Sequence, residues 1–167
     1  MRLSITLAKL LVAGAVLLPV GSAADPAQWA SGRDEGFGFR YAYPQATFAP
    51  IEGDSKPSFH YFVSPDSDAK LLFAAWSNKE GRTPDAFKQW LIANTEGYDE
   101  VTYLPRGRTW FVLSGYRGDN LYYEKVMFSC GGHVVNVFAI AYPVSKRAQY
   151  DPIVERVEDS FKPGPAC

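Results

Sequence analysis

Residues 121–142 read LYYEKVMFSCGGHVVNVFAIAY, two long apolar runs joined by a Gly-Gly turn. Short connections place such runs side by side as antiparallel strands. The second run carries large apolar groups on both faces of the strand, Val135 and Val137 on one and Val134, Phe138 and Ile140 on the other. A sheet that is apolar on both faces needs cover on both faces. The stretch therefore predicts the centre of an α+β sandwich.

Further strands are expected on both sides of this hairpin. The strand-like runs are 39–43, 59–63, 70–76, 101–104 and 109–116, followed by 121–129 and 133–142. Turn-forming residues separate them, including Ser64-Pro65-Asp66-Ser67-Asp68 and Gly118-Asp119-Asn120. We therefore expect an antiparallel sheet of about six or seven strands with helices packed on its faces.

Two helices are expected to cover the sheet. Thr83-Pro84-Asp85 combines a capping hydroxyl, a first-turn proline and a carboxylate that the helix dipole favours, which predicts a helix at 84–94 closed by Gly97. The second helix has an apolar stripe made of Tyr150, Ile153, Val154, Val157 and Phe161. Because proline disfavours a helix interior, Pro152 predicts that this helix begins near Asp151.

The first 24 residues have the features of an export signal. A basic start with Arg2 and Lys9 precedes an apolar run at 10–20 and small residues at 21–24. The run is shorter than the roughly 20 residues that span a bilayer as a helix, so no membrane span is expected after cleavage. We expect a signal peptide at 1–24, a flexible lead-in at 25–38 and a single α+β domain at 39–167. The mature protein would be periplasmic or secreted.

Composition narrows the function classes. Without Arg2 and Lys9, 15 basic residues remain against 18 acidic ones, a net charge of −3 for the mature chain. A nucleic-acid-binding protein normally has a basic surplus, so that class is excluded. Hydrophobic residues at 47% and charged residues at 21% are typical of a globular domain and exclude a disordered acidic tail.

The layout of the chain resembles a known family. A strand ending in Tyr41-Ala42-Tyr43-Pro44, a mid-chain helix, a long antiparallel meander and a final helix ending in Ser160-Phe161-Lys162-Pro163 are similar to the Mog1/PsbP/DcrB-like sandwich. The resemblance covers residues 37–163 and implies an α/β/α sandwich. Because the members of that family are mostly non-catalytic accessory or binding proteins, it also implies a binding role without naming the ligand.

Cys130 and Cys167 are the only cysteines. Export favours a disulfide between them, which would join the C-terminus to the end of a central strand. The alternative is a small thiol hydrolase in which Cys130 is the nucleophile and His133 the base; no motif supplies the orienting group or oxyanion hole that it needs. Serine catalysis lacks a motif as well, because Ser114-Gly115 stands outside a Gly-x-Ser-x-Gly elbow.

No metal or cofactor is expected. His60 and His133 are far apart and lie outside ligand-spacing motifs, and Asp66-Ser67-Asp68 lacks the glycine and distal glutamate of a calcium loop. Arg117-Gly118-Asp119 spells an adhesion tripeptide but has the chemistry of a hairpin turn. A secreted protein inhibitor or a host-interaction protein stays open as an alternative function.

Aromatic residues are the one compositional excess, with 4 Trp, 10 Tyr and 11 Phe. Most are expected in the core. The candidates for an exposed aromatic platform are Trp76, Trp110, Tyr116, Tyr122 and Tyr123, because they lie beside turns or on strand faces that also hold polar groups. The sequence favours a non-enzymatic exported binding or accessory protein that presents Trp110, Tyr116, Arg117 and Tyr123 to an unknown protein or envelope component.

Overall fold

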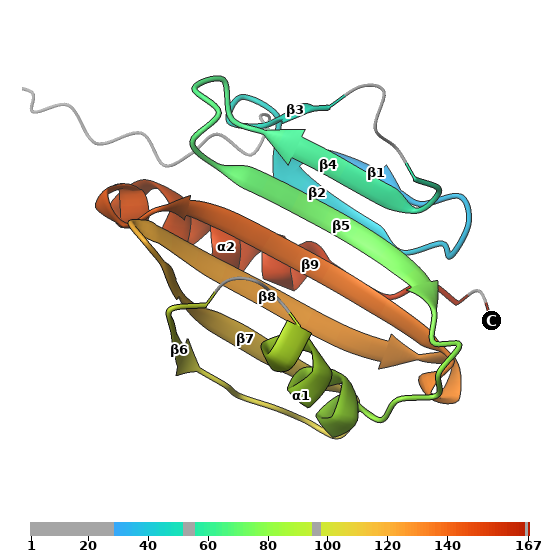
Figure 1. Ribbon diagram of the computed structural model, residues 1–167. Coiled ribbons are helices and arrows are strands. Elements are labelled where there is room, and N and C mark those ends of the chain that lie inside the picture. The colour runs from blue at the N-terminus through green and yellow to red at the C-terminus, as the bar shows by residue number, and fades with distance from the viewer. Residues whose placement is uncertain (1–28, 52–55, 95–97, 166) are drawn as a thin grey trace, which may run out of the picture.

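A seven-stranded antiparallel sheet forms the centre of the fold, with the strand order β3-β4-β5-β9-β8-β7-β6 (Figure 1). The computed structural model describes residues 29–51, 56–94, 98–165 and 167. The strands of the sheet are β3 (Ala49–Pro50), β4 (Phe59–Val63), β5 (Lys70–Ser77), β6 (Glu100–Tyr103), β7 (Trp110–Arg117), β8 (Asn120–Ser129) and β9 (Val134–Pro143). The hairpin predicted from residues 121–142 is β8 and β9, which pair from Ser129 and Val134 to Asn120 and Pro143.

Both faces of this sheet are covered, as the two-sided apolar pattern of β9 predicts. Helix α1 (Pro84–Asn94) packs Phe87 against one face, in a core with Val135 and Val137. Helix α2 (Arg147–Ser160) packs on the other face, where Val157 joins a core with Phe138. Figure 1 shows α1 in front of the sheet and α2 behind it. The predicted α+β sandwich is thereby confirmed.

A two-stranded ribbon shares the α2 side of the sheet. It consists of β1 (Trp29–Arg33) and β2 (Arg40–Pro44), which pair antiparallel. The ring of Tyr41 stacks on Phe73 of β5, with 4.3 Å between ring centroids. Phe39 and Phe161 meet edge to face at 5.8 Å beneath it. Burial of each such ring contributes about 1.5 to 3 kcal/mol, so aromatic packing holds the ribbon to the sheet.

The N-terminal half of the chain differs from the sequence prediction in two ways. Strand β1 lies ten residues before Phe39, within the segment 25–38 that was expected to be a flexible lead-in. The strand expected at 39–43 pairs with β1 and not with the sheet. The pairing was not predicted because the residues of β1 do not alternate between apolar and polar side chains. Its Gly32 leaves room for the ring of Tyr41, since a Cβ at that position would overlap the ring.

Helix α1 has the predicted bounds. The N–H of Ala86 donates to Thr83 Oγ1 over 3.2 Å, which is the expected capping bond. The predicted closing residue, Gly97, lies outside the described residues, and so does the predicted signal segment at 1–24. Within the part of the chain that the structure describes, no helix is long and apolar enough to cross a membrane.

Helix α2 begins earlier than predicted, at Arg147, and keeps Pro152 inside. Pro152 is the sixth residue of the helix, and its ring nitrogen cannot donate the hydrogen bond that an N–H at this position would make to the carbonyl of Ala148. Tyr150 is buried, and Asp151 accepts hydrogen bonds from Tyr142 over 2.7 Å and from Arg147 over 3.2 Å. These contacts hold the turn that precedes the proline, which explains why the prediction of a start near Asp151 was wrong.

Candidate functional site

The face of the sheet that carries α1 is covered only in part. The helix has 11 residues, about 16 Å of length, whereas β8 and β9 have 10 residues each, about 33 Å. Phe87 packs on Phe111 and Phe128, at the end of the sheet remote from the β7–β8 turn. The other half of this face contains a groove of about 250 Å³.

Tyrosines from three separate elements wall this groove. Tyr61 belongs to β4, Tyr98 lies just before β6, and Tyr122 belongs to β8. The floor of the groove is formed by β9, which contributes only the small side chains of Ala139 and Ala141 between β5 and β8. We name this site the tyrosine groove; the side chains on its face of the sheet and at its rim are Ile51, Tyr61, Lys70, Leu72, Tyr98, Tyr122, Glu124, Ala139 and Ala141.

One carboxylate, that of Glu124, lies in this mostly apolar lining. Glu124 follows Tyr122 on the same face of β8 and pairs across the sheet with Ala139 and Leu113. Burial raises the pKa of Glu124 from its ordinary value of 4.5 to about 7. No hydrogen bond or ion pair to its carboxylate is found among the described residues, so nothing in that part of the chain offsets the lost hydration.

The tyrosine walls pack against neighbouring aromatic rings. The rings of Tyr98 and Tyr122 meet edge to face with 6.1 Å between centroids. Burial, and then the negative charge of Glu124, raise the pKa of Tyr98 well above its usual value. Tyr61 stacks on Phe59 along the opposite wall, at 6.2 Å. The described lining of the groove therefore combines aromatic faces with one carboxylate, that of Glu124.

Such a lining can bind and orient a molecule. Aromatic walls bury apolar area, and a few polar groups fix the orientation of what they hold. Within the described residues, the lining has no histidine, cysteine or serine beside Glu124 and no second carboxylate. Nucleophilic or paired-carboxylate catalysis would require such a neighbour.

The four residues predicted to form one aromatic patch are distributed along β7 and β8 and over both faces of the sheet. Trp110 and Tyr116 share a face of β7 but stand six positions apart, about 20 Å along a strand. Arg117 follows Tyr116 and so points to the opposite face of the sheet. Tyr116 and Tyr123 are partly buried against the α2-side core. A binding role for these four residues remains a prediction.

Tyr123 has a structural partner on α2. Its hydroxyl donates to Glu158, and Lys125 donates to the other oxygen of the same carboxylate over 2.6 Å. The ammonium of Lys125 also lies 5.4 Å from the Trp110 ring centroid, within cation–π range. Burial, followed by the hydrogen bond to Glu158, raises the pKa of Tyr123 far above its usual value. This network fastens α2 to β8.

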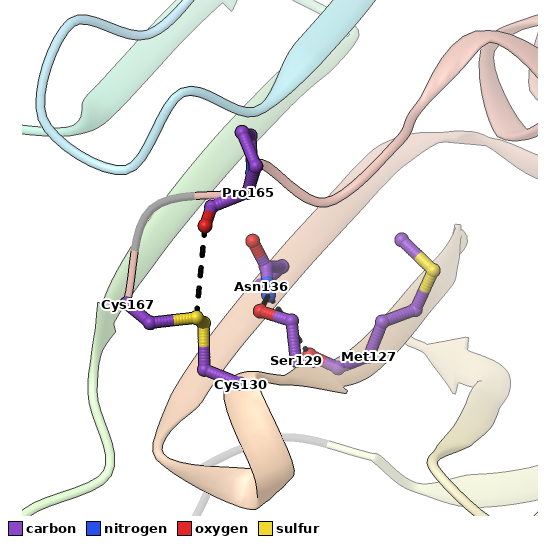
Figure 2. Close-up of a disulfide and its surroundings, with 6 residues drawn as sticks. All are labelled: Met127, Ser129, Cys130, Asn136, Pro165 and Cys167. Carbon is purple, nitrogen blue, oxygen red and sulfur yellow. Dashed lines mark hydrogen bonds between the residues drawn. A yellow bond between two sulfur atoms is a disulfide. The ribbon is translucent and has the colours of Figure 1, made fainter.

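Cys130 and Cys167 form the predicted disulfide, with 5.5 Å between their Cα atoms (Figure 2). Figure 2 shows the bridge beside Asn136, whose side-chain amide donates to Ser129 Oγ over 3.0 Å and to the Met127 carbonyl over 3.3 Å. A thiol hydrolase needs a free thiolate, and the sulfur of Cys130 is bonded. The alternative in which Cys130 is the nucleophile and His133 its base is therefore wrong for the disulfide-bonded protein.

Two sequence motifs have structural roles at turns. Arg117-Gly118-Asp119 contains the tight connection between β7 and β8, as its turn chemistry predicts, with Gly118 at a positive φ of 54°. The Asp66-Ser67-Asp68 turn meets a single lysine: Lys146 lies 2.6 Å from Asp66 and 2.8 Å from Asp68. The hydrogen bond from Lys146 holds the pKa of Asp66 well below its usual range.

One polar cluster was missed by sequence reasoning. Asp34, buried after β1, accepts hydrogen bonds from the Phe37 N–H over 2.6 Å, from Ser58 over 3.0 Å and from His60 Nε2 over 3.0 Å. Burial alone would raise the pKa of Asp34, but these bonds outweigh it and lower that pKa. Both Ser58 and His60 bond to the carboxylate and not to each other, so the cluster ties the ribbon to β4 and lacks a serine–histidine pair.

The sheet, its two covering layers and the open tyrosine groove define an α/β/α sandwich domain with a groove on one face of its sheet. No protein-family model matches the chain, and no curated protein matches its sequence. A solution structure of cyanobacterial PsbP (CyanoP) from Synechocystis sp. PCC 6803 is similar, with a TM-score of 0.56 and 14% identity over 87% of this chain and 99% of that one. The chain therefore has a PsbP-like fold, which confirms the fold that the resemblance implied.

A second solved structure supports the same fold. It is a crystal structure of a protein from Bacteroides thetaiotaomicron VPI-5482, with a TM-score of 0.51 and 18% identity over 81% of this chain. The match covers 48% of that protein, so this chain corresponds to about half of it. At these identities, both likenesses concern the fold alone.

Proposed function

We propose that the protein is an exported, non-enzymatic binding or accessory protein of the bacterial envelope, which holds a small ligand or a side chain of a partner in the tyrosine groove. The observation that carries this proposal is the convergence of Tyr61, Tyr98 and Tyr122 from three separate elements around an open apolar floor. Ligand sites are typically concave, mostly apolar and provided with a few convergent polar groups.

The dimensions of the groove limit what it can hold. A volume of about 250 Å³ equals that of about eight molecules of liquid water, which corresponds to a ligand of roughly ten non-hydrogen atoms. The groove thus suits the apolar part of a metabolite or a single large side chain.

The non-enzymatic part of the proposal rests on the neighbours of Glu124. A carboxyl with a pKa of about 7 can serve as a general acid or base. A reaction would also need a nucleophile or a second acid within reach, and the described lining offers only phenols and the exposed Lys70. A binding function therefore requires fewer groups than a catalytic one, and the described lining supplies them.

Export is supported by two independent features of the chain. The first 24 residues have the charge and apolar pattern of a signal peptide. The disulfide between Cys130 and Cys167 belongs to a compartment that is oxidising. We propose a periplasmic or secreted location, where an envelope component is the expected partner.

Filling the groove tests the proposal. Ala141→Leu adds a side chain to the floor, whereas Ala148→Leu adds the same group on the exposed side of α2. Hexanol, titrated into the isotope-labelled mature protein, should shift the amide signals of groove residues in the native chain and in Ala148→Leu. Ala141→Leu should keep the melting temperature and lose most of these shifts. Equal shifts in both variants would contradict binding in the groove.

A further inference from the structure

Among the described residues, Glu124 differs from Glu158, the other partly buried glutamate of this part of the sheet, because no lysine or arginine pairs with it. On the α2 face, Lys125 and Tyr123 satisfy both oxygens of Glu158. On the groove face, Glu124 lacks an equivalent among the described residues. The fold thus supplies a counter-ion for one carboxylate of this region and leaves the other facing the groove.

The charged and titratable groups around Glu124 come from four elements. Tyr61 faces the groove from β4, Lys70 from β5, Tyr98 from the segment before β6, and Tyr122 from β8 itself. Lys70 is exposed at the rim and makes no ion pair with Glu124 within 4.0 Å. The remaining neighbours from β9 are Ala139 and Ala141, which carry no charge.

Aromatic walls around a carboxylate are a suitable environment for an organic cation. The faces of neutral tyrosine rings are negative and attract an ammonium group within about 6 Å, with a gain of up to about 2 kcal/mol when water is excluded. A carboxylate removed from water gains more from a cation than an exposed one does. A ligand can gain from both the aromatic rings and the carboxylate if it carries a positive charge on an apolar body.

We infer that the tyrosine groove receives an organic cation, an ammonium group on a short apolar chain, with the Glu124 carboxylate as its counter-ion and the rings of Tyr61, Tyr98 and Tyr122 around it. This inference rests on the proposed function of the groove and names the class of its ligand. A cation favours the ionised carboxylate, so binding should weaken as Glu124 is protonated.

Three probes with a six-carbon chain and differently charged head groups separate the contributions. Hexyltrimethylammonium is cationic, hexanol is neutral and hexanoate is anionic at pH 8, and each is titrated into the mature protein at pH 8 and pH 5. At pH 8, hexyltrimethylammonium should bind at least tenfold more tightly than hexanol, and hexanoate should bind most weakly. At pH 5, the advantage of the cation over hexanol should fall to less than twofold.

Two variants assign the effect to one carboxylate. Glu124→Gln should remove the tenfold preference at pH 8 while retaining hexanol binding. Glu155→Gln, which removes an exposed carboxylate from α2, should retain the preference and so exclude a general effect of surface charge.

Each contrary outcome has a definite meaning. Equal affinity for hexanol and the cation at pH 8 would overturn the inference and leave the groove as an apolar binding site. Hexanoate as the tightest ligand at pH 5 would overturn it too, because Glu124 would then act as a hydrogen-bond donor. Absence of binding by all three probes would overturn the proposed function together with the inference.

Discussion

Replacing Glu124 by glutamine should stabilise the folded protein at alkaline pH. The substitution keeps the shape of the side chain and removes its ionisation. In the native chain, the folded-state pKa of Glu124 is about 7 and the ordinary value is 4.5, so the folded protein retains a proton that the unfolded chain releases. The contribution of Glu124 to stability is therefore most favourable below about pH 4.5 and declines as pH rises through 7.

The magnitude follows from the shift of the pKa. Each unit is equivalent to about 1.4 kcal/mol, so raising the pKa from 4.5 to about 7 corresponds to roughly 3 kcal/mol at pH 8. Most of this loss, about 2 to 3 kcal/mol, falls between pH 5 and pH 8. For a domain of this size, the melting temperature should drop by about 6 to 10 °C over that interval for this reason alone.

The assay compares the native chain, Glu124→Gln and the exposed control Glu155→Gln by urea unfolding at pH 5 and pH 8. The free-energy difference between Glu124→Gln and the native chain should grow by about 2 to 3 kcal/mol from pH 5 to pH 8. The corresponding difference for Glu155→Gln should stay within about 0.5 kcal/mol. A Glu124→Gln difference that does not change with pH would show that the carboxylate is hydrated, and the reasoning would fail.

Two further predictions concern the disulfide and the buried aspartate. Replacing both Cys130 and Cys167 by serine opens a loop of 37 residues in sequence separation and should lower the free energy of unfolding by about 3 to 4 kcal/mol, measured by urea unfolding, while hexanol binding persists. Asp34→Asn should lower it by about 1 to 3 kcal/mol at pH 7. Because its hydrogen bonds lower the pKa of Asp34, that deficit should shrink as pH falls below 3.8; a constant deficit in melting temperature would refute this origin.

Local patterns were sufficient to predict most of the elements. The run from 121 to 142 is apolar on both faces, and the structure places it as β8 and β9 at the centre of a sheet covered on both sides. The capping residues of α1 and the pairing of the two cysteines were also readable, because each depends on residue type and order. The strand β1 was not, since Trp29–Arg33 has no apolar alternation and forms through its pairing with β2.

The amino-acid sequence by itself determined the antiparallel meander of the C-terminal strands, the two covering helices and the disulfide, because hydrophobic period, turn chemistry and cysteine count are local properties. Only the tertiary structure decided the candidate site. Glu124 reads along the chain as an ordinary charged residue, and Ala139 and Ala141 read as core positions. They form a groove because α1 is about half the length of β8 and β9, and because Tyr61 and Tyr98 arrive from distant segments. Which half of an apolar sheet face stays open depends on how elements pack, and that is a property of the assembled fold.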